Sequence, residues 1–197
     1  GPHRPSTLEF MDEVVIGATL AYDPDAGLPT DAKAWLLVLT DARTAAADDI
    51  ASYVDVVRRH GAMRVDVADD PDRVAELLRA RRVLNPAMHA LRGDSLNEDV
   101  AVPRGRLFDL LVRLAELSDQ IGLPIGTAGH VGDGNLHPVI CFDPDDPDQV
   151  RTAHRTHELV LGLANELGGT MTGEHGIGLE KLSAVDAELG PRLRGLQ

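Results

Sequence analysis

Apolar residues recur along much of this chain at the three-to-four-residue spacing that places side chains on one face of a helix. The leucines of 106–121 fall at such positions, and their pattern predicts an amphipathic helix. The same spacing predicts helices over 44–60 and 149–167, each followed by glycine, a common residue at helix ends. Another helix is expected to open at Pro71 and to be kinked or ended by Pro86.

Shorter apolar runs indicate strands. Residues 34–40 form a continuous apolar run with polar neighbours, which is typical of a buried strand. Residues 63–67 alternate between apolar and charged side chains, the pattern of a half-buried strand. The segment 8–17 mixes apolar and acidic residues and is expected to begin as a helix. Further short strands are expected at 99–102, 124–128 and 136–142, and a short extended piece at 170–172. The segments 124–128 and 136–142 are either two strands or one long strand interrupted by a bulge or turn.

The alternation of strands and helices predicts an α+β fold in which helices cover one face of a mainly antiparallel sheet. A doubly wound parallel sheet is the competing interpretation. No Gly-x-Gly-x-x-Gly motif follows the first strand, so a nucleotide-binding fingerprint is absent. We therefore favour the antiparallel arrangement, and one domain is the simpler expectation for 197 residues.

Composition narrows the classes of partner. Thirty-two acidic residues against nineteen basic ones give a formal net charge of −13, which argues against a nucleic-acid-binding or anionic-membrane surface. The single cysteine, Cys141, excludes an intrachain disulfide and fits a reducing, cytoplasmic compartment. It lies in an apolar run and is expected to be buried and inert. No apolar stretch reaches the roughly 18 residues of a transmembrane segment.

Two glycine-rich segments contain the side chains best suited to catalysis or metal binding. Residues 129–137 read Gly-His-Val-Gly-Asp-Gly-Asn-Leu-His, and residues 173–178 read Gly-Glu-His-Gly-Ile-Gly. A tight turn between His130 and His137 would let both imidazoles point into one cavity. Neutral imidazoles and a carboxylate such as Glu174 suit Zn²⁺, Mn²⁺ or Fe²⁺. The alternative is that these histidines are structural or exposed.

The other polar residues of these segments divide between proton transfer and turn formation. Because Glu174 and His175 are adjacent, one can bind a metal while the other transfers a proton. An unperturbed histidine pKa of about 6.5 makes His175 a candidate base. Asp133 and Asn135 are either ligands or turn formers, and their glycine neighbours favour the turn. Two histidines on a charged helix face are expected to be solvated, His154 and His157.

These segments, with Asn-Glu-Asp-Val-Ala-Val-Pro at 97–103, closely resemble the C-terminal domain of FAD-linked 2-hydroxy-acid dehydrogenases and oxidases, flavoproteins of the vanillyl-alcohol-oxidase type. The family includes D-lactate dehydrogenase, the glycolate oxidase flavin subunit and D-2-hydroxyglutarate dehydrogenase. The resemblance covers about 8–182 and implies a ferredoxin-like α+β domain that binds substrate and metal. Residues 1–7 then read as a tag scar with a linker, and 183–197 as a truncated C-terminal helix.

The resemblance also implies roles for individual residues. His130, His137 and Glu174 would bind a divalent metal, Zn²⁺ or Mn²⁺/Fe²⁺. His175 would take the proton from the substrate hydroxyl while hydride leaves the α-carbon for the flavin. An arginine in the helix before 97–103 would bind the substrate carboxylate. The residues implied in substrate binding are Arg81, with Arg82 as the fallback, and Asn97; those implied near the flavin are Asn135 and Gly176.

The activity implied is oxidation of a small D-2-hydroxy acid, of lactate or glycolate type, to the 2-oxo acid. FAD would be held mainly by the family's N-terminal FAD domain, which this sequence lacks, so the fragment alone is expected to be inactive. The electron acceptor is not identified. Some relatives that accept a second carboxylate have lysine at position 97 and asparagine at position 139, and their absence here disfavours D-2-hydroxyglutarate. Two other classes stay open: a non-catalytic metal-binding or interaction module, and a metallohydrolase using the same His-His-Glu set.

Overall fold

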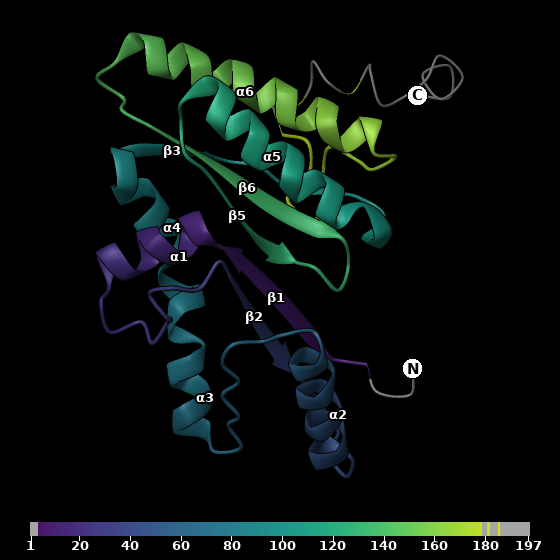
Figure 1. Ribbon diagram of the computed structural model, residues 1–197. Coiled ribbons are helices and arrows are strands. Elements are labelled where there is room, and N and C mark those ends of the chain that lie inside the picture. Colours follow the sequence, from purple (N-terminus) through teal and green to yellow (C-terminus); the bar gives the residue numbers. More distant parts are fainter. Residues whose placement is uncertain (1–3, 179–180, 182–184, 186–197) are drawn as a thin grey trace.

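The computed structural model describes residues 4–178 together with Lys181 and Val185 (Figure 1). Its six strands form one sheet in the order β2-β1-β5-β6-β3, with β4 also on β6, and every pairing is antiparallel. The predicted α+β class with an antiparallel sheet is therefore confirmed. The elements in chain order are β1 (Thr7–Asp12), α1 (Glu13–Tyr22), β2 (Ala34–Leu39), α2 (Ala46–Arg59), α3 (Pro71–Leu77), α4 (Arg79–Arg92), β3 (Asp94–Asn97), β4 (Val100–Ala101), the 3₁₀ turn η1 (Arg104–Arg106), α5 (Leu107–Ile121), β5 (Ile125–His130), β6 (Asn135–Phe142) and α6 (Pro147–Glu166).

Helices cover both faces of the sheet, not the single face that we expected. In Figure 1, α5 and α6 lie together on one side of β5 and β6, and α1 and α4 lie on the other. Side chains of β6 alternate between two cores: Leu136 and Ile140 pack with α5 and α6, whereas Val139 and Cys141 pack with α1 and α4. A strand buried on both faces reads as a continuous apolar run, as 136–142 does.

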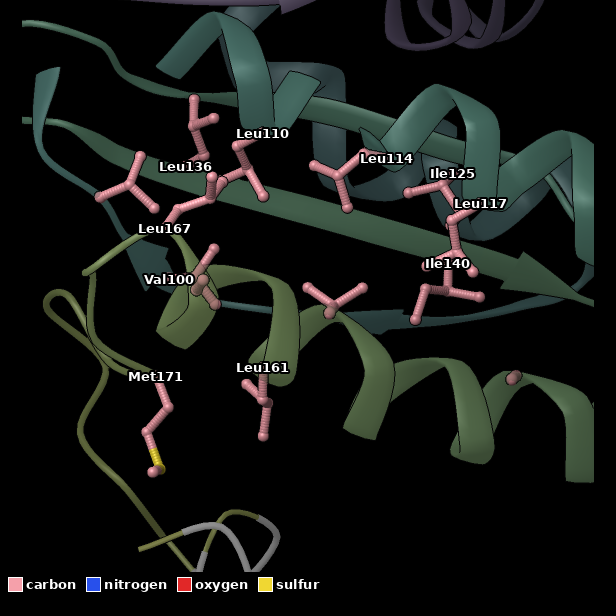
Figure 2. Close-up of a cluster of buried hydrophobic side chains, with 14 of the residues drawn as sticks. Val100, Leu110, Leu114, Leu117, Ile125, Leu136, Ile140, Leu161, Leu167 and Met171 are labelled. Carbon is pink, nitrogen blue, oxygen red and sulfur yellow. The ribbon is translucent and has the colours of Figure 1, made fainter. Parts of the chain in front are cut away.

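The larger core lies between β5, β6 and the pair α5 and α6 (Figure 2). The predicted leucine face of α5 is confirmed, because Leu110, Leu114 and Leu117 are buried there. Gly122, with a φ of 71°, closes this helix in the left-handed conformation that glycine adopts without strain. The helices predicted over 44–60 and 149–167 are also present, as α2 and α6.

The N-terminal expectation was wrong. Residues 8–12 belong to β1 and not to a helix, and β1 begins at Thr7, just before the expected domain boundary. The helix starts only at Glu13, where the Asp12 side chain accepts a hydrogen bond from the Val15 N–H and caps the first turn. The polar residues that obscured the strand pattern, Glu9 and Asp12, have specific hydrogen-bonding partners within the fold.

Two further expectations fail because local patterns do not determine tertiary partners. Residues 63–67 form no strand: Met63 is 74% exposed, and Arg64 and Asp66 pair with each other instead of lying along a neighbouring strand. A helix begins at Pro71 as expected but already ends at Leu77, and Pro86 lies inside the next helix, α4, without ending it.

The remaining strand predictions hold in part. Residues 34–40 do form a strand, but β2 lies at the edge of the sheet and buries only Leu37. The strand at 99–102 is confined to β4, while β3 was not predicted at all. The extended piece at 170–172 makes one bridge, between Thr170 and Ala101 at the sheet edge.

Cys141 is buried as expected. The expected C-terminal helix over 183–197 lies outside the described residues apart from Val185. Within the described part of the chain, none of the helices is long and apolar enough to cross a membrane.

Candidate metal and catalytic site

Strand register places three functional side chains on one face of the sheet. Glu9 of β1 pairs directly with His130 of β5, and His137 of β6 pairs with Ala128, two residues before His130. Because side chains alternate along a strand, all three point to the face that α1 and α4 cover elsewhere. The two histidines thus converge through the pleat of a hairpin.

The hairpin turn at 131–134 depends on two glycines, Gly129 before the turn and Gly134 as its last residue. Gly129 has a φ of 153°, and a Cβ there would lie 2.5 Å from the backbone oxygen of Asn135. Gly134 has a φ of 85°, and a Cβ there would lie 2.2 Å from the Val102 carbonyl oxygen. A side chain would therefore meet backbone at either position. The expected tight turn between the histidines is present, with Asp133 in it, whereas Asn135 is already the first residue of β6.

The loop with Glu174 and His175 follows α6 and returns along the sheet edge beside β4. The Asp99 carboxylate anchors this loop: its Oδ2 accepts hydrogen bonds from the N–H groups of Gly173, Glu174 and His175 at 2.8 to 2.9 Å. Lys181 is also buried, and its Nζ donates to the carbonyl oxygens of Asp99 and Met171. The loop is therefore fixed to the sheet by charged groups.

Donor atoms from the two segments meet at one point. Glu174 Oε1 lies 3.3 Å from His130 Nε2 and 3.5 Å from His137 Nε2, and the three side chains form a group that could hold a metal ion. The His175 ring stacks on His137 with a centroid separation of 5.0 Å, and its Nε2 lies 3.8 Å from Glu174 Oε1. The predicted set His130, His137 and Glu174, with His175 beside it, is brought together.

Neighbouring groups shift the pKa values of His130 and His137 in opposite directions. Burial lowers the pKa of His137 below its usual value. Burial works in the same direction at His130, but a hydrogen bond from Nδ1 to Glu9 Oε1 at 2.7 Å and the nearby Glu174 outweigh it, and the pKa of His130 is raised. At Asp99, burial works to raise the pKa, yet the backbone N–H groups of His175 and Gly173 hold the pKa of that carboxyl below its usual value.

A second group of potential ligands shares one histidine with the first. It consists of Asp99, His137 and His175. Asp99 Oδ2 already accepts the hydrogen bonds of the loop, and its Oδ1 faces Nδ1 of His137 while the Nε2 of that ring faces Glu174. The geometry therefore favours the His130, His137 and Glu174 group as the candidate metal site, with Asp99 behind it.

The other predicted residues lie around this centre. Arg81 of α4 donates from Nε to Glu9 Oε2 at 2.9 Å, which links it to His130 through that carboxylate. Arg82 and Asn97 are exposed, and among the described residues no side-chain hydrogen bond joins either to the site. Asn135 is buried against Gly173, and Gly176 has a φ of 79°.

Sequence reasoning missed two carboxylates and misjudged one histidine. Glu9 and Asp99 are buried beside the site, and only the folded structure shows that they lie there. His157 was expected to be solvated, but its side chain is only 12% exposed and its Nδ1 pairs with the buried carboxylate of Glu98. Asp99 lies in the motif at 97–103. Two acidic residues within this predicted strand were the sequence signal that could have identified Asp99.

An open cavity of about 780 Å³ adjoins the group of His130, His137 and Glu174. His130 and Glu174 line it, together with Glu9 and the arginines Arg4 and Arg104. The cavity gives the side chains of the candidate site access to solvent.

The family model for "FAD linked oxidases, C-terminal domain" matches residues 2–196. The chain belongs to this family. Members with curated names include the glycolate oxidase subunit GlcD of Bacillus subtilis, 32% identical over 94% of this chain, and that of Escherichia coli K12, 34% identical over 93%. A probable mitochondrial D-lactate dehydrogenase of Danio rerio is 34% identical over 93% of the chain.

This FAD-linked oxidase domain spans only 37 to 39% of the length of those three relatives. Among solved structures, a 4-ethylphenol oxidase from Gulosibacter chungangensis in complex with isoeugenol aligns with a TM-score of 0.49 and 14% identity, over 83% of this chain and 38% of that one. The members of this family are oxidoreductases that use FAD as their cofactor.

Proposed function

We propose that this FAD-linked oxidase domain binds the substrate and a divalent metal in an enzyme that oxidises a small D-2-hydroxy acid to the 2-oxo acid. The observation that supports it most is the convergence of three donor atoms beside His175. The names of the relatives, glycolate oxidase and D-lactate dehydrogenase, favour a glycolate or lactate type of substrate. On this proposal the domain alone is inactive, because the protein's own N-terminal FAD domain must supply the flavin.

The donor set fits a divalent metal. With bonds of about 2.0 to 2.1 Å, two ligand atoms in a tetrahedral site lie about 3.3 to 3.4 Å apart. Glu174 Oε1 lies 3.3 and 3.5 Å from the Nε2 atoms of His130 and His137, close to that spacing, and all three donor atoms lie within 4.8 Å of one another. Two imidazole nitrogens and one carboxylate oxygen suit Zn²⁺, Mn²⁺ or Fe²⁺, and the cavity leaves space for a substrate beside them.

When bound, such a metal would polarise the substrate hydroxyl and make it more acidic, and FAD would accept the hydride. His175 is the proposed base. Its side chain is half exposed, so a substrate can reach it, and stacking on His137 holds its ring close to the ligands. His175 would remove the hydroxyl proton as the C–H bond at the α-carbon breaks, and Asp99 holds the backbone that presents it.

Arg81 is the proposed partner of the substrate carboxylate. Its Nε is held by Glu9, while its two terminal nitrogens have no partner among the described residues and can form the bidentate pair that carboxylates favour. Arg82 stays the fallback, and Asn97 is proposed to contact the substrate. Asn135 and Gly176 are proposed to lie near the flavin, because Asn135 packs against the loop that contains His175.

Replacement of the proposed base tests this function in the full-length flavoprotein. We expect His175→Ala to keep its FAD and its metal, and to lose about 10²- to 10⁴-fold in turnover of D-lactate or glycolate, the range that positioned bases contribute. The matched control is His154→Ala, an exposed histidine on α6, which should behave like the wild type. Unchanged turnover by folded His175→Ala would refute the role of His175.

Elemental analysis of the full-length holoenzyme tests the metal separately. We expect one divalent metal ion per chain, lost when Glu174 is replaced by Gln. A holoenzyme that is active without any divalent metal would contradict the ligand assignment while leaving the role of His175 open to its own test. Membership in an FAD-linked family favours this chemistry over a metallohydrolase, which needs no flavin.

A further inference from the structure

Two buried carboxylates beside the site contact neither the substrate nor the metal in the proposed mechanism. Glu9 is 7% exposed and Asp99 is 1% exposed. A buried carboxylate is costly unless charged or hydrogen-bonding groups compensate it. Their partners therefore indicate what they do.

Glu9 is placed opposite His130 by the β1–β5 register. Its Oε1 lies 2.7 Å from His130 Nδ1, whereas Glu174 Oε1 lies 3.3 Å from the Nε2 of the same ring. A carboxylate only accepts, so Nδ1 donates its proton to Glu9, and Nε2, which faces Glu174, is the nitrogen left to bind a metal. Arg81 Nε balances the charge of Glu9 from the other side.

Asp99 faces His137 in a similar way, at a longer distance. Its Oδ1 lies 3.7 Å from His137 Nδ1, and neither atom has a hydrogen-bond partner among the described residues. The Nε2 of His137 points to Glu174, as that of His130 does. Two buried polar atoms of complementary type that face each other need only a small approach to form a hydrogen bond.

The second carboxylate oxygen of Asp99, Oδ2, binds the loop that contains Glu174 and His175. Three consecutive N–H groups, those of Gly173, Glu174 and His175, point at Oδ2, and the Thr172 hydroxyl donates to it at 3.2 Å. Such a run of backbone donors forms a concave anion site, here filled by the protein's own side chain. One carboxylate therefore touches the backbone of Glu174 and the ring of His137.

We propose that Glu9 and Asp99 are positioning residues for the metal site. Each holds the Nδ1–H of one ligand histidine so that its Nε2 is free to bind, and Asp99 also fixes the loop that presents Glu174. This inference rests on the proposed metal site. Carboxylates behind histidine ligands fix the tautomer and raise the basicity of the ligand, and their loss costs about 10- to 100-fold in metal affinity.

The test is Zn²⁺ affinity in the full-length flavoprotein, measured by competition with a chelator. We expect Glu9→Gln and Asp99→Asn to bind Zn²⁺ about 10- to 100-fold more weakly than the wild type, with unchanged FAD content and circular dichroism. The matched control is Glu98→Gln. Glu98 is equally buried and adjacent to Asp99, but it pairs with His157 on α6 and should leave Zn²⁺ affinity unchanged.

Different outcomes separate the two proposals. Wild-type protein that binds no Zn²⁺ would overturn the metal site itself, and the positioning role with it. Wild-type binding with equal affinity in folded Glu9→Gln and Asp99→Asn would overturn only the positioning role. An equal loss in Glu98→Gln would overturn it as well, because the effect would then be general destabilisation. If Asp99→Asn does not fold, the Zn²⁺ affinity of Glu9→Gln alone tests the positioning role.

Discussion

Replacement of Gly173 by alanine should disable the site without touching a charged group. A Cβ at this position would lie 2.5 Å from the Cγ, Oδ1 and Nδ2 atoms of Asn135, where ordinary contacts begin at 3.4 Å. Gly173 is not among the glycines with positive φ, so the obstacle is steric alone. The loop and the Asn135 side chain must therefore separate by about 0.9 Å, the difference between these distances.

Neither partner can move freely. Asn135 is 7% exposed, and its backbone pairs with His130 and Ala101 in the sheet. The loop is bound to Asp99 through three N–H groups, including that of His175. We therefore expect His175 to shift by up to about 1 Å, a displacement that costs about 10²-fold in rate, or about 2.7 kcal/mol of transition-state stabilisation.

The assay is kcat/KM of the full-length flavoprotein with D-lactate and with glycolate. Gly162→Ala on α6 is the matched control: no atom lies within 4 Å of its Cβ position, so activity should be unchanged and stability should rise by about 0.5 to 1 kcal/mol. If Gly173→Ala folds and stays within a factor of three of the wild-type kcat/KM, the steric reasoning is wrong.

Two further predictions concern buried groups outside the site. Burial raises the pKa of Asp12 to about 6 from 3.8, so the folded chain retains a proton that the unfolded chain loses; the free energy of unfolding should fall by up to about 3 kcal/mol from pH 4 to 6. Urea titrations of the chain should show this slope, and its persistence in Asp12→Asn would contradict the assignment. Burial likewise raises the pKa of Cys141 to about 12, and its Sγ contacts the Met88 carbonyl oxygen, so thiol reagents at pH 8 should label Cys141 only after unfolding. Rapid labelling of the native chain, located by mass spectrometry, would be inconsistent with that burial.

Features determined by nearby residues were predictable from sequence. The leucine spacing of α5 identified its buried face, and the glycines between His130 and His137 indicated the turn that brings both rings to one side. The proximity of Glu174 to these histidines could not be derived from spacing alone, and it entered through the resemblance to a family with known motifs. The structure independently places the three donors together.

Features that depend on distant partners were not predictable. Glu9 lies 121 residues before His130, and only the strand register makes them neighbours. Residues 63–67 alternate like a strand yet have no strand to pair with, whereas 7–12 lack a clear pattern and pair on both sides. The free energy of a strand comes mainly from its neighbours, which a single sequence does not specify.

The two-residue period of the β5–β6 hairpin has a consequence for insertions and deletions. His130 and His137 share a face only because of their positions within the pleat, and each has a neighbour, Val131 or Leu136, that packs in the opposite core. One residue added within 126–129 would turn His130 towards the leucines of α5 and leave its proposed partner Glu9 opposite a different side chain. Members of this family should therefore tolerate many substitutions in these strands but almost no change in their length, while the surface segment 60–70, which contributes no strand, is free to vary in length.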